Sequence, residues 1–170
     1  VQYYRSLYNV EQLEILRGPN ALLFGRGGTG GLINRVTKKA EIGEAFGSFD
    51  VGADSFGAAD IAVDANFATS ENTAVRLNLH TDSLANHRDF YEGERYGINP
   101  TVKIQAGDTT VDLSYEYADH ERFIDRGIPT ANNTPVESLK DVVFGVEGLN
   151  LQTLEASILR ANIAHDYSDS

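Results

Sequence analysis

The stretch VDLSYEY, residues Val111–Tyr117, alternates strictly between apolar and polar side chains. Successive side chains of a β-strand point to opposite faces, so a period of two predicts a strand with one apolar and one polar face. A helix would instead repeat its apolar residues every three or four positions. The stretch therefore indicates β structure with two chemically different faces.

The same alternation recurs in five other parts of the chain, at residues 45–53, 61–67, 75–82, 95–105 and 159–167. Six strands of roughly ten residues, each with one apolar face, predict an antiparallel meander rather than alternating strands and helices. About ten residues is also the length with which a tilted strand crosses a bilayer. The expected fold is mainly β, a transmembrane barrel meander of about six strands.

The connections between these segments fall into two classes. Short turn-forming sequences, TSEN at 69–72 and AGD at 106–108, alternate with longer ones at 54–59, at 84–94 and from His120 to Leu154. Short turns at one end and long loops at the other are typical of outer-membrane barrels. Soluble sandwiches and lipocalin-like barrels share the alternation, but have no reason to segregate their loops.

The composition of the chain argues against several classes of protein and of site. The chain has 170 residues, a net charge of -11 and no cysteine. The acidic balance disfavours nucleic-acid binding, and the lack of cysteine excludes disulfides and thiolate metal sites. No apolar run approaches the length of about 18 residues that a transmembrane helix needs. Since no Met or apolar leader opens the sequence, we expect a mature protein or an internal piece of one.

Five of the sixteen glycines lie within seven residues, at Gly25, Gly27, Gly28, Gly30 and Gly31. Their spacing contains G-x-G-x-x-G, the dinucleotide-binding fingerprint, which requires a helix to open at the third glycine. The residues that follow are β-branched at Ile33, Val36 and Thr37, which favours a strand instead. A phosphate-binding P-loop would need Lys-Ser/Thr after the last glycine, and none is present. The glycines therefore predict a structural turn between two extended segments.

The residues around this turn, VEQLEILRGPNALLFGRGGTGGLINRVTKK at Val10–Lys39, resemble the end of the plug domain of TonB-dependent outer-membrane receptors, in the branch that takes up ferric siderophores. The matching positions are Glu14, Arg17, Gly18, Pro19, Leu23, Phe24, Gly25, Gly30, Gly31, Ile33, Asn34, Val36, Thr37 and Lys38. Thr29 departs from the pattern, because proline is usual there, which puts the rigidity of the turn in doubt.

The resemblance implies a domain organisation. Residues 1–40 correspond to the C-terminal part of an α+β plug domain, and residues 41–170 to the first six or so strands of a 22-stranded barrel. The chain is then a fragment, and six strands cannot close a barrel. We expect the isolated piece to aggregate rather than insert as a monomer.

The resemblance also implies a function. Such receptors lie in the outer membrane of Gram-negative bacteria, contact its lipid, and pass a ferric siderophore inward when TonB pulls on the plug through a TonB box, which this sequence lacks. Neither a cofactor nor a resident metal is expected. Other cargoes (cobalamin, haem or an oligosaccharide) and a passive porin-like channel remain as alternatives.

Residue roles follow from the same resemblance. Glu14 and Arg17 are expected to make polar contacts between plug and barrel, although an exposed charge pair of little energetic weight would look the same in sequence. Tyr3 and Tyr4 lie near where the plug rises toward the ligand, or pack the plug core. Residues of the long third loop that could reach the ligand are Arg122, Phe123 and Arg126.

Further aromatic and basic side chains gather where the strands meet the long loops, at His87, Arg88, Phe90, Tyr91, Tyr115, Tyr117 and His120. Arginine and aromatic groups suit an anionic chelate with flat ligand groups. Aromatic residues at strand ends also form the interfacial girdle of any outer-membrane barrel, which is the favoured role of Tyr115 and Tyr117.

No catalytic site is predicted. The four histidines are scattered without metal-ligand spacing, and no G-x-S-x-G nucleophile motif occurs. A nucleotide-dependent enzyme would require a helix after Gly31.

Overall fold

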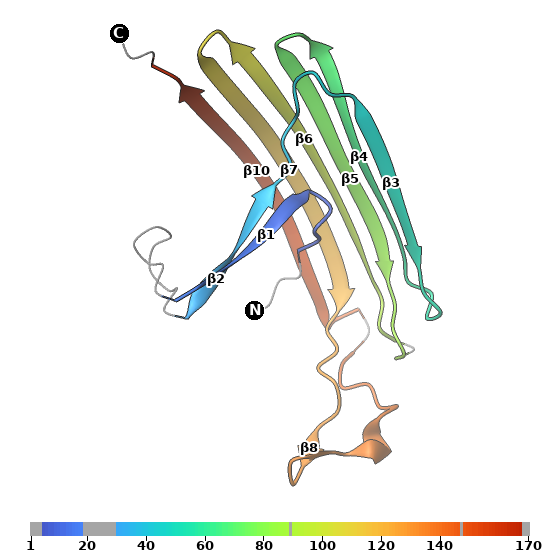
Figure 1. Cartoon of the computed structure of the whole chain (residues 1–170). Coiled ribbons are helices and arrows are strands. Elements are labelled where there is room, and N and C mark those ends of the chain that lie inside the picture. Colours follow the sequence, from blue (N-terminus) through green and yellow to red (C-terminus); the bar gives the residue numbers. More distant parts are fainter. Residues whose placement is uncertain (1–4, 19–29, 89, 147, 168–170) are drawn as a thin grey trace.

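A computed structural model describes residues 5–18, 30–88, 90–146 and 148–167. Its main feature is one antiparallel sheet of six strands in the order β10-β7-β6-β5-β4-β3, which we call the wall (Figure 1). The strands are β3 Phe46–Ala53, β4 Ala59–Ser70, β5 Thr73–Leu84, β6 Gly93–Ala106, β7 Thr109–Phe123 and β10 Leu151–His165. The predicted six-stranded meander is confirmed.

The strands are longer than the predicted ten or so residues. Apart from β3, with 8 residues, they have 12 to 15. The predicted strand lengths were too small because hydrogen bonding between the strands continues beyond the apolar band into polar residues. The alternation of apolar side chains gives no signal for that part of a strand. Thus β7 and β10 pair from Phe123↔Leu151 down to Thr109↔His165.

The third long connection is correspondingly shorter than the interval from His120 to Leu154, and it has structure of its own. It contains the small hairpin β8 Thr130–Ala131 and β9 Thr134–Pro135 and the 3-10 turn η1 Glu137–Leu139. Asn132 and Asn133 form the hairpin turn with φ of 52° and 61°, values that asparagine tolerates better than most residues.

The two ends of the wall differ as the sequence predicts. Residues 71–72 and 107–108 make the tight turns at one end, and Gly107 supplies a φ of 59°. The connections 54–58, 85–92 and 124–150 gather at the other, which we call the long-loop end (Figure 1).

The two faces of the wall are inverted relative to a soluble protein. The apolar face exposes large side chains, such as Leu159 at 78% and Phe49 at 75%. The polar face holds the most buried side chains, and Asn66, Asn78 and Asn99 have no exposed surface. Apolar groups outside and polar groups inside are the arrangement of a sheet whose outer face contacts lipid.

The N-terminal segment, residues 5–18 and 30–45, lies against the polar face. Within it, β1 Val10–Arg17 and β2 Gly31–Thr37 form an antiparallel hairpin, with Arg17 opposite Gly31. A strand therefore follows the glycines, and the helix of a dinucleotide fingerprint is excluded at this position. Among the described residues there is no helix long and apolar enough to cross a membrane.

Gly31 is required by this geometry. Its φ is 130°, and a Cβ there would collide with the carbonyl oxygen of Leu16 on the facing strand. Gly30 accepts a hydrogen bond from the amide of Gly18, 3.4 Å away, which closes the hairpin end. The other glycines of the predicted turn, Gly25, Gly27 and Gly28, lie outside the described residues.

Candidate functional site

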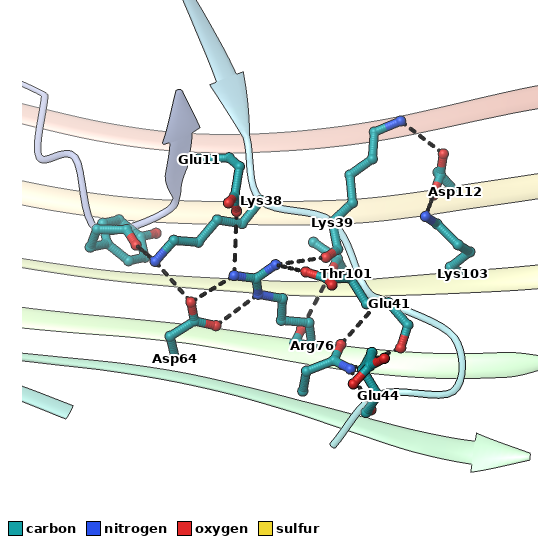
Figure 2. Close-up of polar contacts among 12 residues, drawn as sticks. Glu11, Lys38, Lys39, Glu41, Glu44, Asp64, Arg76, Thr101, Lys103 and Asp112 are labelled. Carbon is teal, nitrogen blue, oxygen red and sulfur yellow. Dashed lines mark hydrogen bonds and ion pairs between the residues drawn. The ribbon is translucent and has the colours of Figure 1, made fainter. Parts of the chain in front are cut away.

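A cluster of charged groups joins the N-terminal segment to β4 and β5 (Figure 2). Arg76 of β5, 4% exposed, makes a bidentate pair with Asp64 of β4, with both N–O distances at 2.8 Å. From the N-terminal segment, Lys38 Nζ lies 2.9 Å from Asp64, and Glu41 and Glu11 lie 3.0 and 3.4 Å from Arg76. We call these five residues the latch.

Buried amides extend the contact on both sides of the latch. Asn66 of β4 donates to the carbonyls of Glu41 and Glu44 at 2.9 and 2.7 Å and accepts from the amide of Glu41 at 3.0 Å. Asn9 donates to Asn99 of β6 at 3.1 Å. These asparagines are fully buried, so their hydrogen bonds offset the cost of removing the amides from water. The segment from Lys38 to Glu44 is thereby fixed on the wall.

A second charged group forms at β7 and β10. Glu116, 5% exposed, faces Arg5 of the N-terminal segment at 3.4 Å and Arg160 of β10 at 2.9 Å. Arg35 of β2 lies near this group, and burial together with the positive charge of Arg5 lowers the pKa of the Arg35 guanidinium. Two arginines pair with one carboxylate and a third lies nearby, so the group, which we call the arginine cluster, carries an excess of positive charge.

The predicted contact residues Glu14 and Arg17 both lie on β1. Glu14 accepts from Asn34 of β2 at 2.8 Å and from Gln12 at 3.3 Å, and both partners belong to the hairpin. Arg17, exposed at the end of β1, is paired with Gly31 across the hairpin. Their role as plug–barrel contacts stays a prediction. Sequence reasoning missed the latch, although Asp64 and Arg76 stand out as charges on the polar side of neighbouring strands.

A cavity of about 230 Å³ opens on the polar face at the long-loop end. Its lining residues are Leu84, Tyr91, Arg95, His120, Arg122, Gln152 and Leu154. Arg95 pairs with Asp82, and Arg122 Nε donates to Gln152 at 2.7 Å, so both guanidinium groups are held in place. Cationic and aromatic groups beside leucines can bind an anionic ligand that also has apolar surface.

The structure separates the predicted ligand residues. Arg122 lines the cavity, whereas Arg126 is exposed on the following loop. Phe123 is 4% exposed and packs edge-on against Phe90, with ring centroids 5.6 Å apart. Tyr3 and Tyr4 lie outside the described residues. Arg95 was not predicted to be a ligand residue, because the alternation puts it on the polar face but only the register of β6 on β7 places it beside His120.

The neighbouring loop residues fix the loops to each other. Arg88 Nε lies 2.6 Å from Asp125, and its terminal nitrogens donate to the carbonyls of Lys140 and Val142 at 2.7 and 2.9 Å. Tyr115 and Tyr117 point to the apolar face, as a girdle requires, and Tyr117 lies 6.1 Å from Tyr96. In the part of the chain that the structure describes, no group of three or more His, Asp or Glu side chains could hold a metal ion.

The wall, with its apolar outer face and a folded segment against its polar inner face, agrees with the class to which the similar proteins belong: the chain is homologous to a segment of TonB-dependent siderophore receptors.

A probable TonB-dependent receptor of Bordetella pertussis, BfrD, is 34% identical over 74% of this chain and 17% of its own length. The metal-pseudopaline receptor CntO of Pseudomonas aeruginosa is 32% identical over 94% of this chain and 23% of its own length. The crystal structure of the siderophore receptor PiuA from Acinetobacter baumannii matches 99% of this chain and 25% of that chain, with a TM-score of 0.90 and 26% identity.

No family model matches the chain. The chain spans about a quarter or less of the length of these relatives, as the coverages of 17%, 23% and 25% show. The relatives are receptors of the Gram-negative outer membrane and not enzymes, which agrees with the expected lack of a catalytic role.

Proposed function

We propose that the protein to which this chain belongs is an outer-membrane receptor that imports ferric siderophores with energy supplied through TonB. Residues 1–40 are then the end of the plug and residues 41–170 the first strands of the barrel. The observation that carries the proposal is the cationic cavity on the polar face, at the end of the wall where the long loops gather. PiuA, whose name describes a siderophore receptor, supports the same cargo class.

The cavity suits this cargo for chemical reasons. A ferric siderophore is commonly an anionic complex with flat or apolar ligand groups, and Arg95, Arg122 and Tyr91 offer charge and an aromatic surface. The iron arrives inside its chelator, so no protein side chain has to coordinate it. The likeness to CntO favours one second candidate, a metal complex of another chelator.

Uptake by cells that carry the full-length gene tests the function. We expect radiolabelled ferric siderophore to accumulate only when TonB is present, and equal uptake without TonB would instead support a passive channel. Parallel assays with zinc-, nickel- and cobalt-loaded chelators decide between the two cargo classes.

The two arginine candidates can be separated by measuring binding of the same ferric chelate to the full-length receptor. Arg122 lines the cavity and Arg126 lies outside it, so Arg122→Gln should weaken binding of the ferric chelate about tenfold, the worth of one hydrogen bond to a charged group. Arg126→Gln should change it less than twofold. The reverse order would place the cargo on the third loop rather than in the cavity.

A further inference from the structure

Three residues of the polar face form a shallow trough across the wall. His80 of β5 lies opposite Gly97 of β6, and Gly97 lies opposite Ala118 of β7. Gly97 has no side chain and Ala118 only a methyl group, so the floor of the trough is backbone beside the imidazole of His80. The next polar-face residues toward the long-loop end, about 7 Å away, are Arg95 and His120 of the cavity.

The side chain of Tyr8, from the N-terminal segment, fills this trough. A Cβ on Gly97 would lie 2.8 Å from the Tyr8 hydroxyl oxygen and 2.9 Å from each of two ring carbons, so the ring rests directly on the β6 backbone. The same ring stacks on His80, with centroids 5.4 Å apart and planes 16° apart. Only glycine at position 97 leaves room for this contact.

The backbone carbonyl of Tyr8 accepts a hydrogen bond from Lys38 Nζ at 2.9 Å, but shape rather than hydrogen bonding holds its side chain in the trough. The hydroxyl group is buried and has no hydrogen-bond partner among the residues that the structure describes. Burial, assisted by the charge of Glu116, raises the pKa of Tyr8 to about 12, so the phenol is neutral at physiological pH. A buried hydroxyl without a partner is a cost, and the ring contact therefore has to offset it.

A chain of contacts connects this seat to the cavity. Nε2 of His80 lies 3.6 Å from Oδ2 of Asp82, two residues closer to the long-loop end on the same strand. Asp82 in turn accepts a hydrogen bond from Nε of Arg95 at 2.9 Å, and Arg95 lines the cavity. Both His80 and Asp82 are 7% exposed, so these contacts are shielded from water.

We propose that Tyr8 is a positioning residue that seats the plug in a notch at Gly97, and that the contacts Arg95–Asp82–His80 couple this seat to cargo binding in the cavity. The coupling rests on the proposed function, whereas the seat does not. A chelate that pulls on Arg95 changes the surroundings of Asp82 and His80, and so the surface on which Tyr8 stacks. The surface of the wall that the plug contacts through Tyr8 therefore differs between the cargo-bound and the cargo-free receptor.

A double-mutant cycle in the full-length receptor tests the seat without any cargo. The readout is entry of a large antibiotic that an intact outer membrane excludes. We expect Gly97→Ala to raise this leak by about fivefold or more, and to add less than twofold in a Tyr8→Ala background, where the ring that it strikes is gone. Equal effects of Gly97→Ala in both backgrounds would overturn the proposed seat.

Two further variants serve as controls for this double-mutant cycle. Gly47→Ala places a methyl group in open space, since its Cβ would meet nothing closer than the Asp64 carbonyl oxygen at 3.9 Å, and should leave the leak unchanged. Tyr8→Phe keeps the ring and removes only the unpartnered hydroxyl, so it should also stay closed. A leak in Tyr8→Phe as large as in Tyr8→Ala would show that the hydroxyl group, not the ring, holds the plug, contrary to the proposal.

Affinity for a ferric tris-catecholate chelate tests the coupling. We expect Gly97→Ala to change the Kd by at least about fivefold, the lower end of measured coupling between sites, and by less than twofold in an Asp82→Asn background, where the contact chain is broken. An unchanged Kd in Gly97→Ala, or the same change in both backgrounds, would overturn the coupling. If the wild-type receptor binds none of the ferric chelates tested, the proposed function fails, while the leak assay still decides the seat.

Discussion

The latch and the arginine cluster hold the same N-terminal segment to the same polar face, but in different ways. In the latch, Arg76 is 4% exposed and its bidentate partner Asp64 is 9% exposed, and positive and negative groups are closely matched. In the arginine cluster, one buried carboxylate faces two arginine side chains that are 41% and 40% exposed.

Burial and pairing explain what this difference means. Breaking a buried and hydrogen-bonded pair leaves an uncompensated charge, whereas a half-exposed arginine regains water when it loses its partner. The latch should therefore stay closed while the arginine cluster opens. The proposed role of this segment as a plug requires both properties, a fixed connection to the barrel and contacts that can be released.

The largest expected effect comes from breaking the latch. Arg76→Met in the full-length receptor leaves Asp64 buried with Lys38 as its one ion-pair partner among the described residues, so the opening free energy of residues 38–44 should fall by about 3–5 kcal/mol. Hydrogen–deuterium exchange of those amides measures it. The double variant Arg76→Met/Asp64→Asn should recover part of the loss, and a fall below about 1 kcal/mol in the single variant would contradict the assigned strength of the latch.

The sequence predicts the strands of the wall, but it does not predict the contacts between the wall and the N-terminal segment. Alternation placed all six strands, because one face of each strand had to be apolar. It could not place Lys38 against Asp64, Glu41 against Arg76, or Tyr8 on Gly97, because those contacts depend on how the segment lies on the wall, and side chains of any polar kind satisfy the alternation. The roles of Glu14 and Arg17 were inferred from the family resemblance and stay predictions. The two extended segments predicted on either side of the glycines do form the hairpin of β1 and β2.

A smaller effect is expected at the arginine cluster. Glu116→Gln removes the only carboxylate near Arg5 and Arg160 among the described residues, but both arginines are partly solvated. The opening free energy of residues 5–9 should fall by about 1 kcal/mol. If the same exchange experiment gives a loss equal to that of Arg76→Met, the two regions do not differ in the way proposed.

The smallest effect is expected for an exposed pair at the edge of the latch. Lys39 Nζ lies 2.9 Å from Asp112 on β7, yet the lysine side chain is 53% exposed. Lys39→Ala should therefore change the opening free energy of residues 38–44 by less than about 1 kcal/mol. Added salt should have little further effect on the opening free energy of this variant, because the screened ion pair is already absent. A loss of several kcal/mol would mean that exposure is a poor guide to strength on this face.

The inverted faces of the wall imply that one face contacts lipid and that the other face, which holds the N-terminal segment, does not. Leu159 and Ile158 are neighbours on β10, and their side chains point to opposite faces, with Leu159 78% exposed. Nitroxide labels at these two positions of the full-length receptor in lipid bilayers, studied by collision with oxygen and with a water-soluble nickel chelate, test the claim directly. We expect the label at 159 to collide mainly with oxygen, as a lipid-facing group does, and the label at 158 not to do so. The same oxygen preference at both positions, or a reversed order, would contradict it.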